Sequence, residues 1–224
     1  MRITPAIIPE SFDDLKEKIS LIRGIFSDIQ IDVCDGKFVP SKSWPYRGDG
    51  GEWEKILREE EGLPFWEEID FEADLMVSPP FQSAEDWILA GASRVVVHFE
   101  SLKDDEEFGK IREAVLGRAE LGLALHVETE PEKAYSLFPA LSFVQLMGIS
   151  RIGFQGEEFD KKVLNKIKNI RKDFPDVSIS VDGGVNLENA EEIISSGASC
   201  LVVGSAIFES DVPRESALLF KNLI

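Results

Sequence analysis

Three apolar runs of the chain each carry an aspartate near the C-terminal end: Asp32, Asp74 and Asp182. Carboxylates that converge in a dry cavity are costly to hold together unless a cation, a bound proton or a ligand offsets their charge. The three residues therefore predict either a metal site or a pair of proton-transfer groups. The alternative is that the three aspartates have only structural roles, in which Asp32 and Asp182 cap loops and Asp74 is solvated.

Gln30 precedes the first of these aspartates by two positions. Successive side chains of a strand point to opposite faces, so Gln30 and Asp32 share one face, and the apolar Ile31 and Val33 share the other. The polar face of this run is therefore the one expected to carry chemistry.

Two glycine-containing turns indicate an anion site. Gly183 and Gly184 directly follow Asp182, and Gly204 and Ser205 follow a later apolar run. Turns without bulky side chains expose backbone N–H groups, and the last two strand-to-helix loops are the usual phosphate site of barrels with eight strands and eight helices. The sequence therefore predicts a phosphate ester as substrate, bound by these four residues.

The elements that must position these residues alternate between strands and helices. Eight apolar runs of strand length lie at residues 3–8, 28–33, 71–77, 94–99, 122–127, 142–147, 177–182 and 200–204. Strands that alternate with helical patterns predict an α/β fold, and eight such units predict a single-domain (β/α)8 TIM barrel over residues 1–224. A doubly wound open sheet is the alternative, which the lack of a G-x-G-x-x-G motif after the first run disfavours.

The segments between the strands show apolar residues at helical spacing. One stripe consists of Phe12, Leu15, Ile19 and Ile22, so a helix that covers the sheet is expected there. Ser11 and Ser83 are the expected N-caps of two helices, since each precedes a helical segment with acidic residues in its first turn.

Residues 41–63 interrupt this regular pattern with an enlarged second strand-to-helix loop. Such loops lie on the face of a barrel that carries the active site, so a lid or an assembly contact is one interpretation. The other is a solvated excursion anchored by Trp44 and Trp53.

Composition excludes several classes of function. The chain has 224 residues and a net charge of -18, which removes the electrostatic attraction that a nucleic-acid binder needs. No apolar run approaches the roughly 20 residues of a membrane helix, and the first residues lack an apolar signal region, so we expect a soluble, cytoplasmic protein without membrane contacts. Cys34 and Cys200 have no metal-type spacing and are expected to be reduced structural thiols.

The motifs resemble those of the ribulose-phosphate 3-epimerase family over nearly the whole chain. Residues 32–40 read D-V-C-D-G-K-F-V-P where the family has D-V-M-D-G-x-F-V-P, and residues 181–186 read V-D-G-G-V-N. Further matches are Asp74-Leu75-Met76-Val77, His98-Phe99-Glu100, Met147 and residues 204–208. Related barrels that decarboxylate or form carbon–carbon bonds carry a lysine in a D-x-K-x-x-D run, which the stretch from Asp32 to Asp35 lacks.

The resemblance implies an isomerase of carbohydrate metabolism that interconverts D-ribulose 5-phosphate and D-xylulose 5-phosphate in the pentose phosphate reactions. Asp32 and Asp182 match the family's aspartates and would be the acid and the base at C3. The alternatives are a phosphosugar-binding barrel that has lost epimerase activity and a different phosphosugar isomerase. No organic cofactor is expected, and a homo-oligomer is left open.

The residues depart from the family at the metal site. Gln30 and Asp74 stand where the family has its two histidine ligands, beside Asp32 and Asp182. A ligand set made only of oxygen atoms favours Mg, Mn or Ca over Zn. Ala6 replaces a serine, and residues 150–156 match the family's phosphate loop only loosely.

The two histidines have different expected roles. His98 belongs to the family's H-x-E motif and should face the barrel interior, where a satisfied core histidine is the simpler interpretation. His126 ends its run without a counterpart in the family, so it is a candidate extra ligand or general acid because imidazole titrates near neutral pH.

Overall fold

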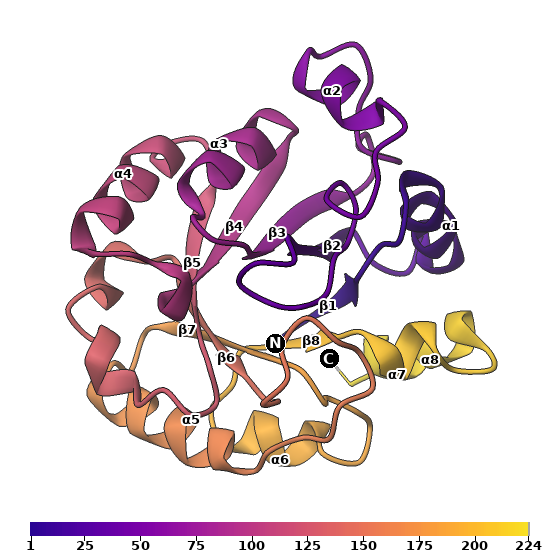
Figure 1. Cartoon of the computed structure of the whole chain (residues 1–224). Coiled ribbons are helices and arrows are strands. Elements are labelled where there is room, and N and C mark those ends of the chain that lie inside the picture. The colour runs from indigo at the N-terminus through magenta and orange to yellow at the C-terminus, as the bar shows by residue number, and fades with distance from the viewer. Residues whose placement is uncertain (224) are drawn as a thin grey trace.

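Residues 1–223, which the computed structural model describes, form a closed barrel of parallel strands wrapped by helices (Figure 1). The strands are β1 Arg2–Ile7, β2 Asp28–Cys34, β3 Asp70–Met76, β4 Ala92–His98, β5 Glu120–Leu125, β6 Phe143–Met147, β7 Ser178–Asp182 and β8 Cys200–Val203. Each strand pairs with its neighbours in the sequence, and β8 closes the barrel against β1. The predicted (β/α)8 barrel is therefore confirmed, and the open-sheet alternative is wrong.

The helices lie outside the strands (Figure 1). They are α1 Phe12–Ile22, α2 Glu52–Leu57, α3 Phe81–Leu89, α4 Asp105–Val115, α5 Lys162–Asp173, α6 Ala190–Ser195, α7 Ser205–Phe208 and α8 Pro213–Lys221. Between β5 and β6 the chain makes two short 3-10 turns, η2 Pro131–Ala134 and η3 Phe138–Ala140, and a further turn, η1 Phe99–Ser101, follows β4.

The two faces of the strands have different compositions. Ile31 and Val33 are fully buried in the main apolar core, which extends to the inner faces of the helices. Gln30, two residues before Asp32, instead reaches Asp182 on β7, which is not a neighbour of β2 in the barrel. The predicted alternation along β2 is therefore observed, with its polar face directed into the barrel.

One of the two predicted helix caps is confirmed. Ser11 accepts a hydrogen bond from the backbone N–H of Asp14 at 3.1 Å and is the N-cap of α1. The prediction for Ser83 is wrong, because α3 begins two residues earlier, after Pro80, whose φ of -83° leads into the helix. The Ser83 hydroxyl lies 2.7 Å from the Tyr46 hydroxyl instead.

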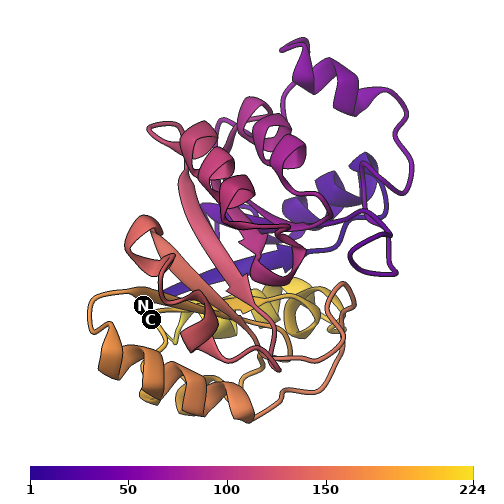
Figure 2. The same cartoon turned by 60° about the vertical axis from the view of Figure 1, so that its left-hand side comes forward.

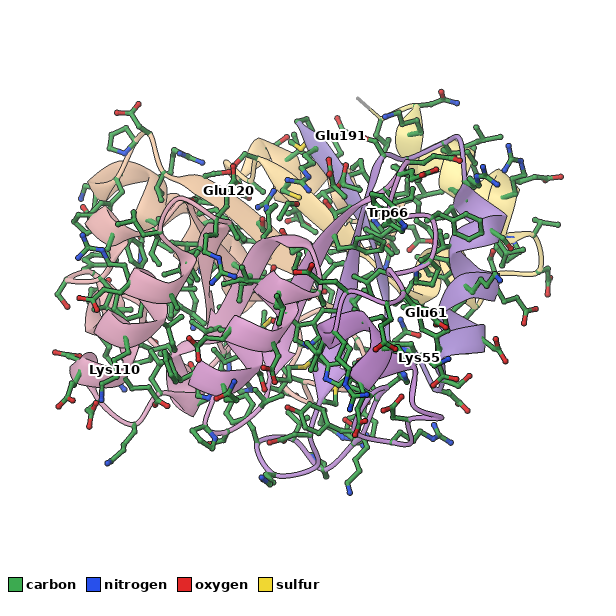
Figure 3. The ribbon with its side chains drawn as sticks, turned by 90° about the horizontal axis from the view of Figure 1, so that it is seen from above. Lys55, Glu61, Trp66, Lys110, Glu120 and Glu191 are labelled. Atoms are coloured by element: carbon green, nitrogen blue, oxygen red, sulfur yellow. The ribbon has the colours of Figure 1, made fainter. Side chains whose placement is uncertain are left out.

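The segment between β2 and β3 carries α2, which stands away from the barrel in two views (Figures 1 and 2). Trp44 is fully buried beneath it and packs against the rings of Phe12, Trp53 and Trp87 at 5.3 to 6.0 Å between centroids. Lys55 and Glu61 form an ion pair of 2.9 Å in this segment, which also carries the exposed Trp66 (Figure 3). The aromatic cluster thus attaches this segment to α1 and α3.

Cys34 and Cys200 are both buried and unpaired, as expected for structural thiols. Within the described residues no helix is both long enough and apolar enough to cross a membrane.

Candidate active site

Three aspartates meet inside the C-terminal end of the barrel. The strand register sets Asp32 opposite Asp74, and Asp182 is the last residue of β7. All three side chains are buried, and one carboxylate oxygen from each lies within 4.8 Å of the others. The predicted convergence of these carboxylates is therefore observed. Three hard oxygen donors at this spacing fit a divalent metal ion.

Gln30 lies between two of the aspartates. Its amide nitrogen donates hydrogen bonds to Asp32 Oδ1 at 2.7 Å and to Asp182 Oδ2 at 2.8 Å. Its amide oxygen is buried and has no hydrogen-bond partner among the described residues. Gln30 thus belongs to the carboxylate cluster, but it presents its nitrogen to the carboxylates, and its oxygen could ligate a metal only after the amide turned over.

Gln145 on β6 is part of the cluster and was missed by the sequence analysis. Its amide nitrogen lies 3.3 Å from Asp74 Oδ2 and 3.2 Å from Asp182 Oδ2, and it donates a hydrogen bond to each. A single amide in the apolar strand Phe143–Met147, on the same face as Met147, is the signal that could have identified it.

His98 faces the interior, as expected, and contacts the cluster from β4. Its Nε2 lies 3.0 Å from Asp74 Oδ1, and both side chains are fully buried. Burial lowers the pKa of His98, but the charge of Asp74 and the hydrogen bond to it raise this pKa more, so the net shift is upward. His98 is therefore a fully buried hydrogen-bond partner of Asp74.

The remaining two carboxyl groups have raised pKa values. Burial, followed by the charges of Asp182 and Asp74, raises the pKa of Asp32 well above its ordinary value. Burial and the charge of Asp74 raise the pKa of Asp182 to about 7. The cluster therefore carries a proton near neutral pH, which is the condition under which one carboxyl can donate while another accepts.

A cavity at the barrel mouth connects Asp32 and Asp182 to the glycine turns. The turn residues Gly183, Gly184, Gly204 and Ser205 line it, together with Ala6, Met76, Met147 and residues of the loop that follows β6. Gly183 and Gly184 adopt positive φ of 99° and 69°. A Cβ on Gly184 would lie 2.7 Å from the backbone of Phe159, so close packing also requires glycine there.

The loop after β6 closes one side of this cavity. Gly153, Phe154, Gln155 and Glu157 line it, and the Gln155 amide nitrogen lies 2.8 Å from where a Cβ of Gly204 would be. Glu157 forms an ion pair of 3.0 Å with Arg151. The loosely matching stretch 150–156 therefore lies beside the predicted phosphate turns.

His126 lies away from the carboxylates and is not among the residues that line the cavity. Its Nε2 is 2.9 Å from the carbonyl oxygen of Ser150, and its backbone N–H donates to Glu100. The structure therefore does not bring the predicted extra ligand or general acid into the site, because its ring turns toward the loop after β6.

Comparison with known proteins gives a family match over most of the chain. Residues 2–208 match the model of the "Ribulose-phosphate 3 epimerase family". The chain is 28% identical over 229 residues to a ribulose-phosphate 3-epimerase of Schizosaccharomyces pombe, with 100% of this chain and 93% of that protein covered. It is 30% identical to a chloroplastic ribulose-5-phosphate-3-epimerase of Arabidopsis thaliana, with 92% of this chain and 71% of that protein covered.

Solved structures share the fold at lower identity. A 3-hexulose-6-phosphate synthase superimposes with a TM-score of 0.73 at 20% identity, with 100% of both chains covered. A phosphoribosyl anthranilate isomerase of Thermus thermophilus superimposes with a TM-score of 0.64 at 16% identity, also with 100% of both chains covered.

Proposed function

We propose, from the premise that the chain belongs to the ribulose-phosphate 3-epimerase family and is therefore an isomerase, that it interconverts D-ribulose 5-phosphate and D-xylulose 5-phosphate. The observation that carries the proposal is the pair Asp32 and Asp182. These two carboxyls come from β2 and β7, reach one cavity, and are joined by the amide of Gln30.

The proposed chemistry is proton transfer at C3 of the sugar. One carboxylate removes the C3 proton, the electrons of the C–H bond form an enediolate with the neighbouring ketone, and the other carboxyl returns a proton to the opposite face. The pKa of about 7 for Asp182 and the raised pKa of Asp32 support this division, because one group can be protonated while the other is charged.

The phosphate is proposed to bind at the turns that follow β7 and β8. Gly183, Gly184, Gly204 and Ser205 line the same cavity as the two carboxyls, so one ligand can contact both regions. Backbone N–H donors at contact distance outweigh the overall charge of -18, because that distant charge is screened by salt.

The carboxylates of Asp32, Asp74 and Asp182 are the groups that could hold a divalent cation, and Gln30 would add an oxygen donor only if its amide turned over. When bound, the cation would supply positive charge for the enediolate oxygens. Oxygen donors favour Mg or Mn over Zn, and three carboxylates leave a site with such an ion about one charge negative, which weakens that stabilisation.

The direct test is conversion of D-ribulose 5-phosphate to D-xylulose 5-phosphate, measured with chelator and with added Mg, Mn or Zn. Incorporation of solvent deuterium at C3 should accompany turnover. Calorimetric binding of the phosphosugar without conversion or exchange would instead support a binding barrel and contradict the proposal.

Metal content gives a separate prediction. Elemental analysis of protein purified without added metal should find Mg, Mn or no metal, and Asp74→His should raise the affinity for zinc because it adds an imidazole nitrogen. Zinc titration of wild type and variant measures this. Tight one-to-one zinc in the wild type would contradict the proposed ligand set.

A cytoplasmic location is a further prediction, and a homo-oligomeric state is left open. Cell fractionation tests the first, and light scattering of the purified protein tests the second.

A further inference from the structure

Gln145 lies among the carboxylates without a role in the proton-transfer scheme. It is fully buried on β6, a strand that is otherwise apolar. Its amide nitrogen carries two N–H groups and lies 3.3 Å from Asp74 Oδ2 and 3.2 Å from Asp182 Oδ2, closer than its third acceptor, the Met147 sulfur at 3.9 Å. A buried amide that uses both of its donors on carboxylates holds the positions of both.

Gln30 makes the same arrangement on the other side of Asp182. Its two donors go to Asp32 and Asp182, and Asp182 Oδ2 accepts from both glutamines. The result is a continuous chain of hydrogen bonds in the order Asp32, Gln30, Asp182, Gln145, Asp74. Every aspartate of the cluster is thereby tied to another through an amide nitrogen.

The orientation of both amides is informative. The oxygens of Gln30 and Gln145 are buried without hydrogen-bond partners in the part of the chain that the structure describes. An unpaired buried oxygen is unfavourable, so the charge-assisted hydrogen bonds made by the nitrogens must outweigh that cost. The carboxylates therefore dictate which way the amides turn.

We propose that Gln145 is a positioning residue which, together with Gln30, bridges the three aspartates, so that the arrangement of Asp32 and Asp182 is complete without a metal ion. A cation in the cluster would compete with the amide N–H groups for the same oxygen atoms. That the bridge positions Asp32 and Asp182 for proton transfer rests on the proposed epimerase function, whereas the hydrogen-bonded bridge itself does not.

The test compares three variants with the wild type. Gln145→Leu keeps most of the volume and removes both N–H donors, and Gln145→Glu keeps the shape and adds a charge. Ser180→Ala is the matched control, because Ser180 pairs with Gln145 in the strand register and its hydroxyl has no hydrogen-bond partner among the described residues.

The first readout is the thermal unfolding midpoint in chelator and in millimolar Mg. In wild type and Ser180→Ala, Mg should change the midpoint little. In Gln145→Leu, Mg should raise the midpoint that the substitution lowered. The rise should be largest in Gln145→Glu. If Mg changes the midpoint equally in all four proteins, or less in the Gln145 variants than in wild type, the proposed bridge is wrong.

The second readout is kinetic. Gln145→Leu in chelator should reduce kcat at least tenfold, leave KM for the phosphosugar within about twofold, and regain activity with Mg. A change in KM alone would overturn the positioning role. If the wild type is inactive while the midpoints behave as expected, the epimerase proposal fails and the bridge stands.

A third measurement needs no variant that perturbs the bridge. In the 15N spectrum of the wild type, the side-chain amides of Gln30 and Gln145 should exchange slowly with solvent, in contrast to Gln82, whose side chain makes an exposed bond to Asp86. Fast exchange of all glutamine amides would overturn the proposal even if the variants failed to fold.

Discussion

Asp32 and Asp182 are each expected to be indispensable to turnover. Asp32→Asn and Asp182→Asn change volume little but remove one of the two proton carriers, so each should abolish epimerisation while the protein still folds. Turnover and deuterium exchange at C3 measure the effect, with thermal unfolding as the check on folding. Turnover like that of the wild type in either variant would contradict the two-carboxyl assignment.

The raised pKa of Asp182 also predicts how stability depends on pH. In the folded protein this carboxyl stays protonated up to about pH 7, whereas in the unfolded chain it ionises near its ordinary value of 3.8. Its contribution to stability is therefore full below about pH 3.8 and falls as the pH rises to about 7, with a slope of about 1.4 kcal/mol per pH unit between these limits. The raised pKa of Asp32 likewise makes the free energy of unfolding fall as the pH rises.

Urea unfolding between pH 4.5 and 7.5, in chelator, measures this slope. Other carboxylates contribute slopes of their own, so the informative quantity is the difference between wild type and Asp182→Asn, which should lose stability less steeply with rising pH. Identical profiles would show that Asp182 ionises at its ordinary pKa.

The sequence identified the aspartates because strand ends converge in a barrel, but it did not identify Gln145. Whether an inward side chain touches a residue three strands away, as Gln145 touches Asp74, depends on how far the closed sheet is sheared, and no local pattern encodes that distance. The same limit applies to His126, whose ring direction is set by the loop after β6.

The next prediction concerns the turn after β8, where Gly204 is proposed to leave space for the phosphate. Gly204 has a φ of -98° and a ψ of -93°, a pair outside the main regions that alanine adopts. Gly204→Ala should therefore raise KM for the phosphosugar both through its methyl group and through a shift of the turn. Gly109→Ala on α4 is the matched control, since a Cβ there meets nothing within 4 Å.

The methyl would also approach the Gln155 amide at 2.8 Å, so a second variant separates this contact from the effects on the phosphate. In Gly204→Ala with Gln155→Ala, a KM that stays high reports lost phosphate contacts. A KM that returns to the wild-type value would show that only the contact with Gln155 was disturbed.

At the level of strands and helices, sequence patterns predicted most of what the barrel contains. All eight strands lie within about two residues of their predicted bounds, because β-branched runs between helical segments are unambiguous when repeated. The start of α3 was wrong because Pro80 permits the helix to begin before Ser83. The short 3-10 turns between β5 and β6 follow from proline at 131 and 139.

The aromatic cluster joins the segment between β2 and β3 to the body of the barrel. Trp44 is fully buried against three other rings, so Trp44→Ala should lower the free energy of unfolding by about 3 to 5 kcal/mol. Scanning calorimetry measures the loss. Trp66→Ala, at a side chain that is 64% exposed, is the control and should change stability by less than about 1 kcal/mol.

The position of this cluster determines which part of the molecule tryptophan fluorescence monitors during unfolding. All four tryptophans precede residue 88, and three of them are in contact around Trp44. Tryptophan emission therefore follows the docking of the segment that carries α2, and the strands from β4 to β8 contribute no emission of this kind. Far-UV circular dichroism samples every helix, so divergence of the two optical transitions would reveal the order in which the halves of the barrel come apart.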